Sequence, residues 1–299
     1  MISVILPSYN SEKMIEPVLS ALKNQSYKSP YEIILVDSSD DNTPQIVRSK
    51  FPGINYIHLS EKTDPGTARN IGLKESNGDI ILFIDSDCIA NKNWIEKMVT
   101  QHETSDYAAV GGSVVNGNDP SSKIAWAGYM AEFREFIPQQ KEKEVSHIPT
   151  CNISYKRKYL EELGGFNPNF YPQEDLDFNY RLYRIGGKIF FNPQIQVAHN
   201  HRTQIGSFFQ HQKNVGLITS SMLRILPLEG SAIAQSRLKT VLLIPFIPFV
   251  KWVRTVLIFL RLQPLTVLKN PSAVCILLLG LFPWSIGFLN GVFMTKADR

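Results

Sequence analysis

Residues 80–88 read IILFIDSDC, an apolar run followed by two aspartates. The apolar run Ile80–Ile84 is short, rich in isoleucine and bounded by polar residues, a pattern typical of a buried strand. Asp85 and Asp87 follow directly, so we expect both carboxylates where the strand ends. Mg²⁺ and Mn²⁺ prefer oxygen ligands and often share their coordination shell with substrate phosphates. The stretch therefore predicts a divalent-cation site at one edge of a sheet.

The same alternation runs upstream of this stretch. Short apolar runs predict strands at Ile2–Leu6, Tyr31–Val36 and Asn55–Leu59. Helical spacing separates them at Ser11–Asn24, Thr43–Lys50 and Gly66–Glu75, with Asn10 or Ser11 as the expected N-cap of the first helix. Strand–helix alternation predicts an α/β fold with a mostly parallel sheet covered by helices, and such sheets bind ligands at the carboxyl ends of their strands.

The middle of the chain is less regular. Ala125–Phe136 has the spacing of an amphipathic helix, and the charged stretch Gln139–Glu144 reads as a mobile loop over the site. Ile189–Phe191 and Gln196–Ala198 are two short strand candidates.

Polar residues at the ends of the first two strands suit a nucleoside. Tyr9 offers a ring for stacking on a base, and Asp37 offers a carboxylate that accepts from a base N–H group. In the segment KTDPGTARNIG, Gly66 permits a tight turn, and Arg69 either reaches a phosphate or clamps Asp37 or Asp85. The glycine fingerprints of dinucleotide-binding and P-loop proteins are absent from the sequence.

Two further groups of residues lie later in the chain. Glu174 and Asp175 open a helix whose dipole favours their ionised form, and an ionised carboxylate can act as a general base. Asp177 and Arg181 are four residues apart and should pair on the helix surface. In HNHR, His199 is a candidate third metal ligand, and His201 is a weaker one.

The tail is basic and apolar. From Arg202 onward there are eleven Lys and Arg against two Asp and Glu, whereas the preceding residues carry 20 basic and 25 acidic side chains. Val241–Leu260 is apolar but interrupted by prolines, Lys251 and Arg254, so it either spans a membrane or lies in its interface. Ala273–Met294 is uncharged and long enough to span. The alternative is that both are buried helices of a soluble domain. Arg261 and Lys269 lie between the runs, while Lys296 and Arg299 follow the second, so positive charge does not decide the topology.

Composition narrows the class of protein. With 43% hydrophobic and 19% charged residues the chain is an ordinary globular one rather than a disordered or collagen-like one. The three cysteines, Cys88, Cys151 and Cys275, are few, widely spaced and without a CxxC pair, which argues against disulfides and a thiolate zinc site and fits a reducing compartment. The start, MISVILP, lacks the features of a signal peptide, so we expect the N-terminal domain to stay in the cytoplasm.

Taken in order, six stretches resemble the inverting family 2 glycosyltransferases with the GT-A fold. They are VILPSYN, EIILVDSSDDNT, GTARNIGL, ILFIDSDC with the downstream Trp94, CNISYKRKYLEELGGFN, and QEDLDFNYRLYRIGG followed by VAHNHR. The resemblance covers about residues 1–235 and implies a GT-A catalytic domain there, with residues 236–299 as a C-terminal membrane-associated or transmembrane region.

The resemblance also implies roles for matching residues. The nucleotide-sugar would be bound by Pro7, Ser8, Tyr9, Asp37, Arg69 and Asp85. The metal would be bound by Asp87, Asp85 and His199. Asp175, with Glu174 beside it, resembles the catalytic base, and Gly164 and Gly165 resemble the turn on the acceptor side. Ser38 and Ser39 replace a frequent Asp and Gly, which leaves the base of the donor open.

The implied activity is transfer of a sugar, with inversion, to a hydroxyl of a saccharide or lipid-linked acceptor in cell-envelope polysaccharide or glycolipid synthesis. The implied cofactor is Mn²⁺ or Mg²⁺. The family favours UDP-sugar donors, with GDP and dTDP as alternatives. We expect a protein at the cell membrane with its catalytic domain in the cytoplasm and no nucleic-acid partner. The alternative readings are an inactive membrane scaffold of the same fold and a sugar nucleotidyltransferase, whose glycine-rich phosphate loop is replaced here by PSYN.

Overall fold

The computed structural model describes residues 1–294. The chain divides into two compact units. Residues 1–117 and 136–200 form the sheet unit, and residues 118–135 with those from 201 onward form the helical unit. Residues 201–235, which the sequence analysis groups with the catalytic domain, thus belong with the C-terminal helices, and a functional boundary at residue 235 stays a prediction. Lys296 and Arg299 lie outside the described residues.

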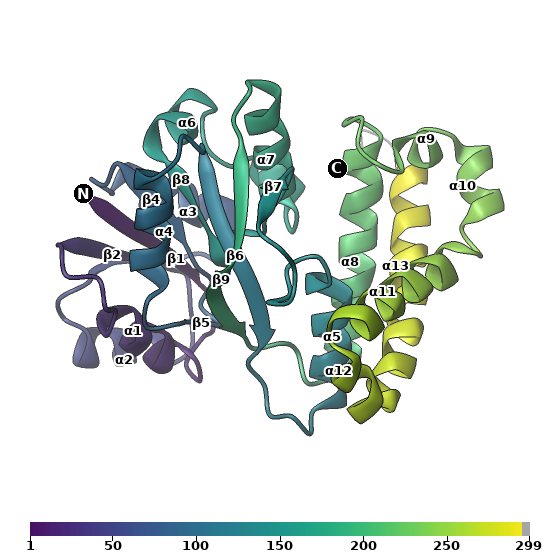
Figure 1. Cartoon of the computed structure of the whole chain (residues 1–299), viewed down its shortest axis with the longest axis horizontal. Helices are drawn as coiled ribbons and strands as arrows, with labels where there is room; N and C mark the ends of the chain where they lie inside the picture. The colour runs from purple at the N-terminus through teal and green to yellow at the C-terminus, as the bar shows by residue number, and fades with distance from the viewer. Residues whose placement is uncertain (295–299) are drawn as a thin grey trace. The chain divides into compact units, whose positions relative to one another are not determined.

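The sheet unit contains nine strands and their connecting helices (Figure 1). Its first half consists of β1 (Ile2–Ser8), α1 (Ile15–Lys23), β2 (Tyr31–Asp37), α2 (Thr43–Lys50), β3 (Asn55–His58), α3 (Pro65–Lys74) and β4 (Ile80–Phe83). Its second half consists of β5 (Cys88–Ala90), α4 (Trp94–Glu103), β6 (Ala109–Asn116), β7 (Lys143–Val145), β8 (Ile153–Lys156), α6 (Arg157–Glu162), α7 (Glu174–Arg184) and β9 (Ile189–His199). Two short 3₁₀ turns lie at Thr150–Asn152 and Pro168–Phe170.

The strand order is β3-β2-β1-β4-β8-β6-β9-β5, with β7 paired to β9. The first four strands are parallel to one another, as the sequence predicts, and antiparallel β8 joins them to the second half. β1 and β2 are in register, with Ser8 opposite Asp37. Because these strands are parallel, their carboxyl ends meet at one edge, where the polar residues that follow them are brought together. Buried Ile, Val, Leu and aromatic side chains of both sheet faces form the core.

Three local predictions differ from the structure. Helix α1 begins at Ile15 with Met14 as its N-cap and no side-chain capping bond, rather than at Asn10 or Ser11. The backbone N–H groups of Asn10 and Ser11 instead donate to hydroxyls of the Ser39–Thr43 turn, so tertiary contacts replace a local cap. The end of the predicted loop Gln139–Glu144 belongs to β7, and the two short strand candidates after residue 188 form one strand, β9.

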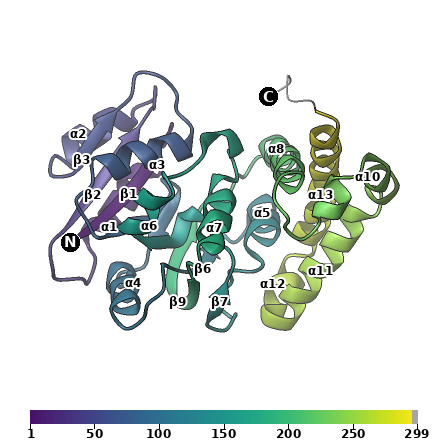
Figure 2. The same ribbon diagram turned by 90° about the horizontal axis from the view of Figure 1, so that it is seen from above.

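The helical unit contains seven helices among the described residues. They are α5 (Lys123–Phe133), α8 (Ile205–Leu223), α9 (Ser231–Ala234), α10 (Arg237–Leu243), α11 (Ile247–Leu262), α12 (Pro264–Lys269) and α13 (Pro271–Phe293). Figures 1 and 2 both show α8 and α13 side by side. Helix α13 is long and apolar enough to cross a membrane. Helices α10 and α11 are so only when taken together, and the chain bends by 64° between them. The apolar tail predicted from sequence is therefore present as helices.

Candidate active site

The two carboxylates of the DSD stretch face different partners. Asp85 and Asp87 leave the end of β4, as predicted, and Asp85 is drawn toward Arg69 of α3, whose Nη2 donates to Asp85 Oδ1 at 2.6 Å. Asp87 instead lies beside His199, with 3.6 Å between Asp87 Oδ1 and His199 Nε2. The two aspartates therefore have different partners: Asp85 is paired with Arg69, and Asp87 lies beside His199.

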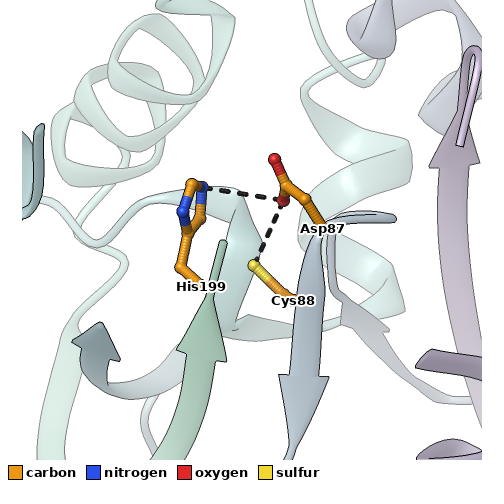
Figure 3. A group of neighbouring side chains, drawn as sticks. All are labelled: Asp87, Cys88 and His199. Carbon is orange, nitrogen blue, oxygen red and sulfur yellow. Dashed lines mark hydrogen bonds and ion pairs between the residues drawn. The ribbon is translucent and has the colours of Figure 1, made fainter. Parts of the chain in front are cut away.

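Asp87, Cys88 and His199 form a candidate metal centre (Figure 3). Cys88 and His199 lie opposite each other in the antiparallel β5–β9 pair, which places both side chains on one face of the sheet. The Cys88 thiol donates to Asp87 Oδ1 at 3.5 Å, and the three ligand atoms all lie within 4.8 Å of one another. Ligands about 2.0–2.3 Å from one ion stand roughly 3–3.7 Å apart, so these residues fit a bound divalent cation.

Arg69 is the buried centre of a carboxylate network. Its guanidinium is only 3% exposed and donates to Glu174 Oε1 through Nη1 and to Asp85 through Nη2. Burial lowers the pKa of Arg69, but the carboxylates of Asp85 and Glu174 outweigh it and raise that pKa overall, so the guanidinium stays charged. Of the partners considered from sequence, Arg69 binds Asp85 and not Asp37.

Glu174 and Asp175 begin α7, as predicted. The helix dipole favours their ionised forms, but burial favours the protonated forms and raises the pKa of both carboxyls. Desolvation raises the pKa of Asp175, while Arg69 and the backbone N–H groups of Thr150 and Leu176 lower it. Desolvation likewise raises the pKa of Glu174 against the opposing effect of Arg69. A carboxylate whose pKa lies above its usual range is a stronger base, so burial makes Asp175 more basic than an exposed aspartate.

Two glycines allow close contacts of α3, one with α7 and one with the segment before α7. A Cβ on Gly66 would stand 3.1 Å from Glu174 Cγ, so Gly66 makes room for Glu174 rather than forming the predicted turn. Asp64 caps α3 by accepting from the Thr67 N–H group. Gly165 has a φ of +75° and leaves space for Asn70, which exchanges two hydrogen bonds with the backbone of Phe166.

The edge formed by β1 and β2 contains the residues predicted to bind a nucleoside. Pro7 and Ser8 end β1, and the hydroxyl of Ser8 is buried without a hydrogen-bond partner. Tyr9 is exposed and its ring lies 4.3 Å from Lys62 Nζ. Asp37 is fully buried and accepts hydrogen bonds from Ser39 and Tyr56, so its carboxylate is held by the protein itself.

Other predicted residues are placed as follows. His201 belongs to the helical unit, where its ring packs against those of Tyr129 and Phe133. Asp177 and Arg181 pair as predicted, with 2.9 Å between Oδ2 and Nε. Sequence reasoning missed Cys88, because it sought thiolates only in CxxC spacing, although the register of β5 against β9 places this thiol beside His199.

Comparison with known proteins identifies the family of the chain. The model of the family named glycosyl transferase family 2 matches residues 3–164. The glycosyltransferase AglE of Haloferax volcanii is 27% identical over 227 residues, which is 72% of this chain and 71% of AglE. The poly(ribitol-phosphate) beta-N-acetylglucosaminyltransferase TarS of Staphylococcus aureus is 37% identical over 180 residues, 58% of this chain but only 30% of TarS.

Solved structures share the fold. The mannosyltransferase PcManGT of Pyrobaculum calidifontis, solved with GDP-Man and Mn²⁺, has a TM-score of 0.64 at 18% identity and covers 96% of this chain and 86% of its own. Residues 1–349 of S. aureus TarS, solved with UDP-GlcNAc, have a TM-score of 0.57 at 19% identity, over 95% of this chain and 90% of that one. The predicted GT-A architecture is confirmed, and the chain belongs to glycosyl transferase family 2.

Proposed function

We propose that this glycosyltransferase moves a sugar from a nucleotide-sugar donor, with UDP the favoured nucleotide, to a hydroxyl of a saccharide or lipid-linked acceptor. The observation that carries the proposal is the gathering, beyond the carboxyl end of β4, of two groups of side chains. One is the candidate metal centre, which His199 of β9 completes, and the other is the buried carboxylate network, which Arg69 of α3 and Glu174 of α7 complete. The donors named for PcManGT and TarS, GDP-Man and UDP-GlcNAc, support a nucleotide-sugar donor. A cell-envelope or glycolipid acceptor at the membrane is supported by the apolar helix α13.

The metal ion would be held by Asp87 and His199, with the Cys88 thiol beside them. When bound, Mn²⁺ or Mg²⁺ neutralises the charge that grows on the departing nucleotide diphosphate. Asp85 is predicted from sequence as a metal ligand, but its Oδ1 accepts a hydrogen bond from Arg69 and it is not part of the candidate metal centre. We propose that Arg69 holds Asp85 on the ribose side of the donor, and that Asp87 supplies the carboxylate ligand.

The donor nucleoside would bind across the ends of β1 and β2. Tyr9, whose ring centroid lies 4.3 Å from Lys62 Nζ, offers its ring, and the buried Ser8 hydroxyl, which lacks a partner, offers a hydrogen bond. Asp37 is fully buried and held by Tyr56 and Ser39, so it would accept a base N–H only once a covering side chain such as Tyr56 moves aside. Lys62 over the ring also adds positive charge beside the phosphates.

Asp175 would be the base of the reaction. It removes the proton from the acceptor hydroxyl as the oxygen attacks the anomeric carbon from the face opposite the nucleotide, and the configuration inverts. Thr150 and Leu176 hold its two oxygens in place through backbone N–H groups. Glu174 is bound to Arg69 and serves as a positioning residue that joins α7 to α3.

The first test is thermal stabilisation of the full chain by a panel of UDP-, GDP- and dTDP-sugars, with and without Mn²⁺ or Mg²⁺. We expect metal-dependent stabilisation by one nucleotide, its loss in Asp87→Ala, and its retention in Asp106→Ala, which alters an exposed aspartate outside the site. Stabilisation that survives Asp87→Ala would contradict the metal assignment. An absence of stabilisation with every nucleotide would favour an inactive scaffold.

A further inference from the structure

Exposed apolar side chains are concentrated in the helical unit. Among the described residues, the sheet unit exposes five large apolar side chains, whereas the helical unit exposes eighteen. Soluble proteins rarely expose so many large apolar side chains in one region. Large exposed apolar patches mark surfaces that bind a partner or a membrane.

On α11 these side chains form one stripe. Phe249, Val250, Val253, Leu257 and Leu260 are exposed, and at about 100° per residue they fall within roughly 100° of the helix surface. The exposed Arg254 and Arg261 lie at the edge of that stripe, within about 40° of it. An apolar stripe edged by basic residues is typical of a helix that lies in a membrane interface.

Helix α13 continues this surface. Its exposed large side chains Leu279, Phe282, Ile286 and Phe293 form a narrow stripe, and the ring of Phe282 contacts that of Phe249 on α11 with 5.8 Å between centroids. The opposite face of α13 is buried, with Trp284, Phe288 and Val292 in the core of the unit. Only one side of the long apolar helix can therefore meet lipid.

The buried face of α13 is joined to α8 by glycines. A Cβ on Gly216 would stand 1.9 Å from the backbone oxygen of Trp284, and one on Gly287 would stand 1.9 Å from that of Lys213. At the C-terminal end of α13, Arg224 donates to the backbone oxygens of Gly291 and Met294. Contact this close fixes α8 along α13.

The contact between α8 and α13 places polar side chains beside the middle of α13. Lys213 and Asn214 of α8 are exposed and lie level with Trp284 to Gly287, near the centre of Pro271–Phe293. If α13 crossed a bilayer, both side chains would lie at the depth of the hydrocarbon, where a lysine lowers insertion strongly. The neighbouring α11, with 16 residues, is about 24 Å long, short of the ~30 Å of hydrocarbon.

We propose that the helical unit docks onto one leaflet of an anionic bilayer through the exposed stripes of α10 to α13, and that α13 does not cross. The charge of the segment fits such a partner, because the residues from Arg202 onward contain eleven basic and two acidic side chains. Exposed Arg237, Lys239 and Lys269 lie on the same helices as the apolar residues. The inference does not depend on which sugar is transferred.

The first experiment is flotation of the full chain with vesicles of phosphatidylcholine, alone or mixed with phosphatidylglycerol. Leu257→Glu and Phe282→Glu should each weaken binding about tenfold or more, whereas Ile185→Glu, a matched exposed residue of the sheet unit, should not. Replacing Arg261 and Lys269 with glutamine should weaken binding about fivefold each, on phosphatidylglycerol vesicles only. Unchanged binding in the glutamate variants, or self-association without vesicle binding, would overturn the proposal.

The second experiment tests whether α13 crosses. Single cysteines are introduced as Asn214→Cys on α8 and Leu257→Cys on α11, in a Cys275→Ser background where Cys88 and Cys151 are buried. On membranes, a water-soluble maleimide should label Asn214→Cys as fast as in detergent, while Leu257→Cys should be protected. Protection of Asn214→Cys on the membrane would place α8 and α13 within the bilayer and overturn the docking model.

Discussion

Replacing Arg69 with glutamine would leave Glu174 as a buried carboxylate without its cation. Glu174 is 4% exposed, its Oε1 is bound to Arg69, and its Oε2 has no hydrogen-bond partner. Removing one member of a buried ion pair typically costs about 3–5 kcal/mol, because the remaining charge stays desolvated. Asp85 is 30% exposed on its side chain and can be solvated, so most of the loss should come from Glu174.

The assay is urea unfolding of Arg69→Gln, Glu174→Gln and the double variant. We expect the double variant to recover much of the stability that Arg69→Gln loses, because no buried charge remains. In Arg69→Gln the pKa of Glu174, already raised by burial, should rise further. A raised folded-state pKa means that folding takes up a proton, so the deficit should be largest near pH 8 and shrink as the pH falls toward about 4.3. A loss below about 1 kcal/mol, or strict additivity in the double variant, would refute this account.

Further predictions concern the base, the metal centre and one turn. Asp175→Asn should lower kcat by ~10²–10⁴-fold while calorimetry still detects donor binding. Asp177→Asn, which removes the partly buried pair with Arg181 on the same helix, should leave kcat within a few fold. Because burial raises the pKa of Asp175, the acidic limb of the kcat/KM profile should lie above pH ~3.9, with activity lost as the base is protonated, and a limb at or below that pH would contradict the assignment. Cys88→Ser should weaken Zn²⁺ relative to Mn²⁺ in competition binding, since thiolates favour zinc; equal effects on both ions would exclude the thiol as a ligand. Gly165→Ala should lower the free energy of unfolding by more than Gly164→Ala, because both have positive φ but only at Gly165 would a Cβ meet Asn70; equal losses would argue against that contact.

Strands β1, β2 and β4 could be predicted closely from sequence because they are buried on both faces. The predicted Ile2–Leu6 and Ile80–Ile84 differ from β1 and β4 by one or two residues at their ends. The start of α1 could not be predicted, because the segment before it is held by Ser39 and Thr43, which lie about thirty residues away. β7 carries no apolar pattern of its own and becomes a strand only by pairing with β9.

The candidate site was predictable residue by residue but not as a set of contacts. The positions of Asp87, Asp175 and His199 follow from motifs at strand and helix ends. The sequence left Arg69 with a choice of partners, and the choice of Glu174, 105 residues away, depends on how α3 packs against α7. Burial of the α7 start, which raises the pKa of its carboxylates, likewise depends on tertiary packing and not on the helix alone.

The pairing of β5 with β9 has a consequence for how the protein matures. Asp87 and Cys88 are made early and His199 late, so the three meet only once β9 has paired with β5, the edge strand of the sheet. An unfinished or partly opened chain offers a cation only isolated side chains. A cation bound by the finished set would hold that edge strand in place, by a free energy that grows with the logarithm of the cation concentration over its dissociation constant. Metal supply would then act on the lifetime of the enzyme as well as on its turnover.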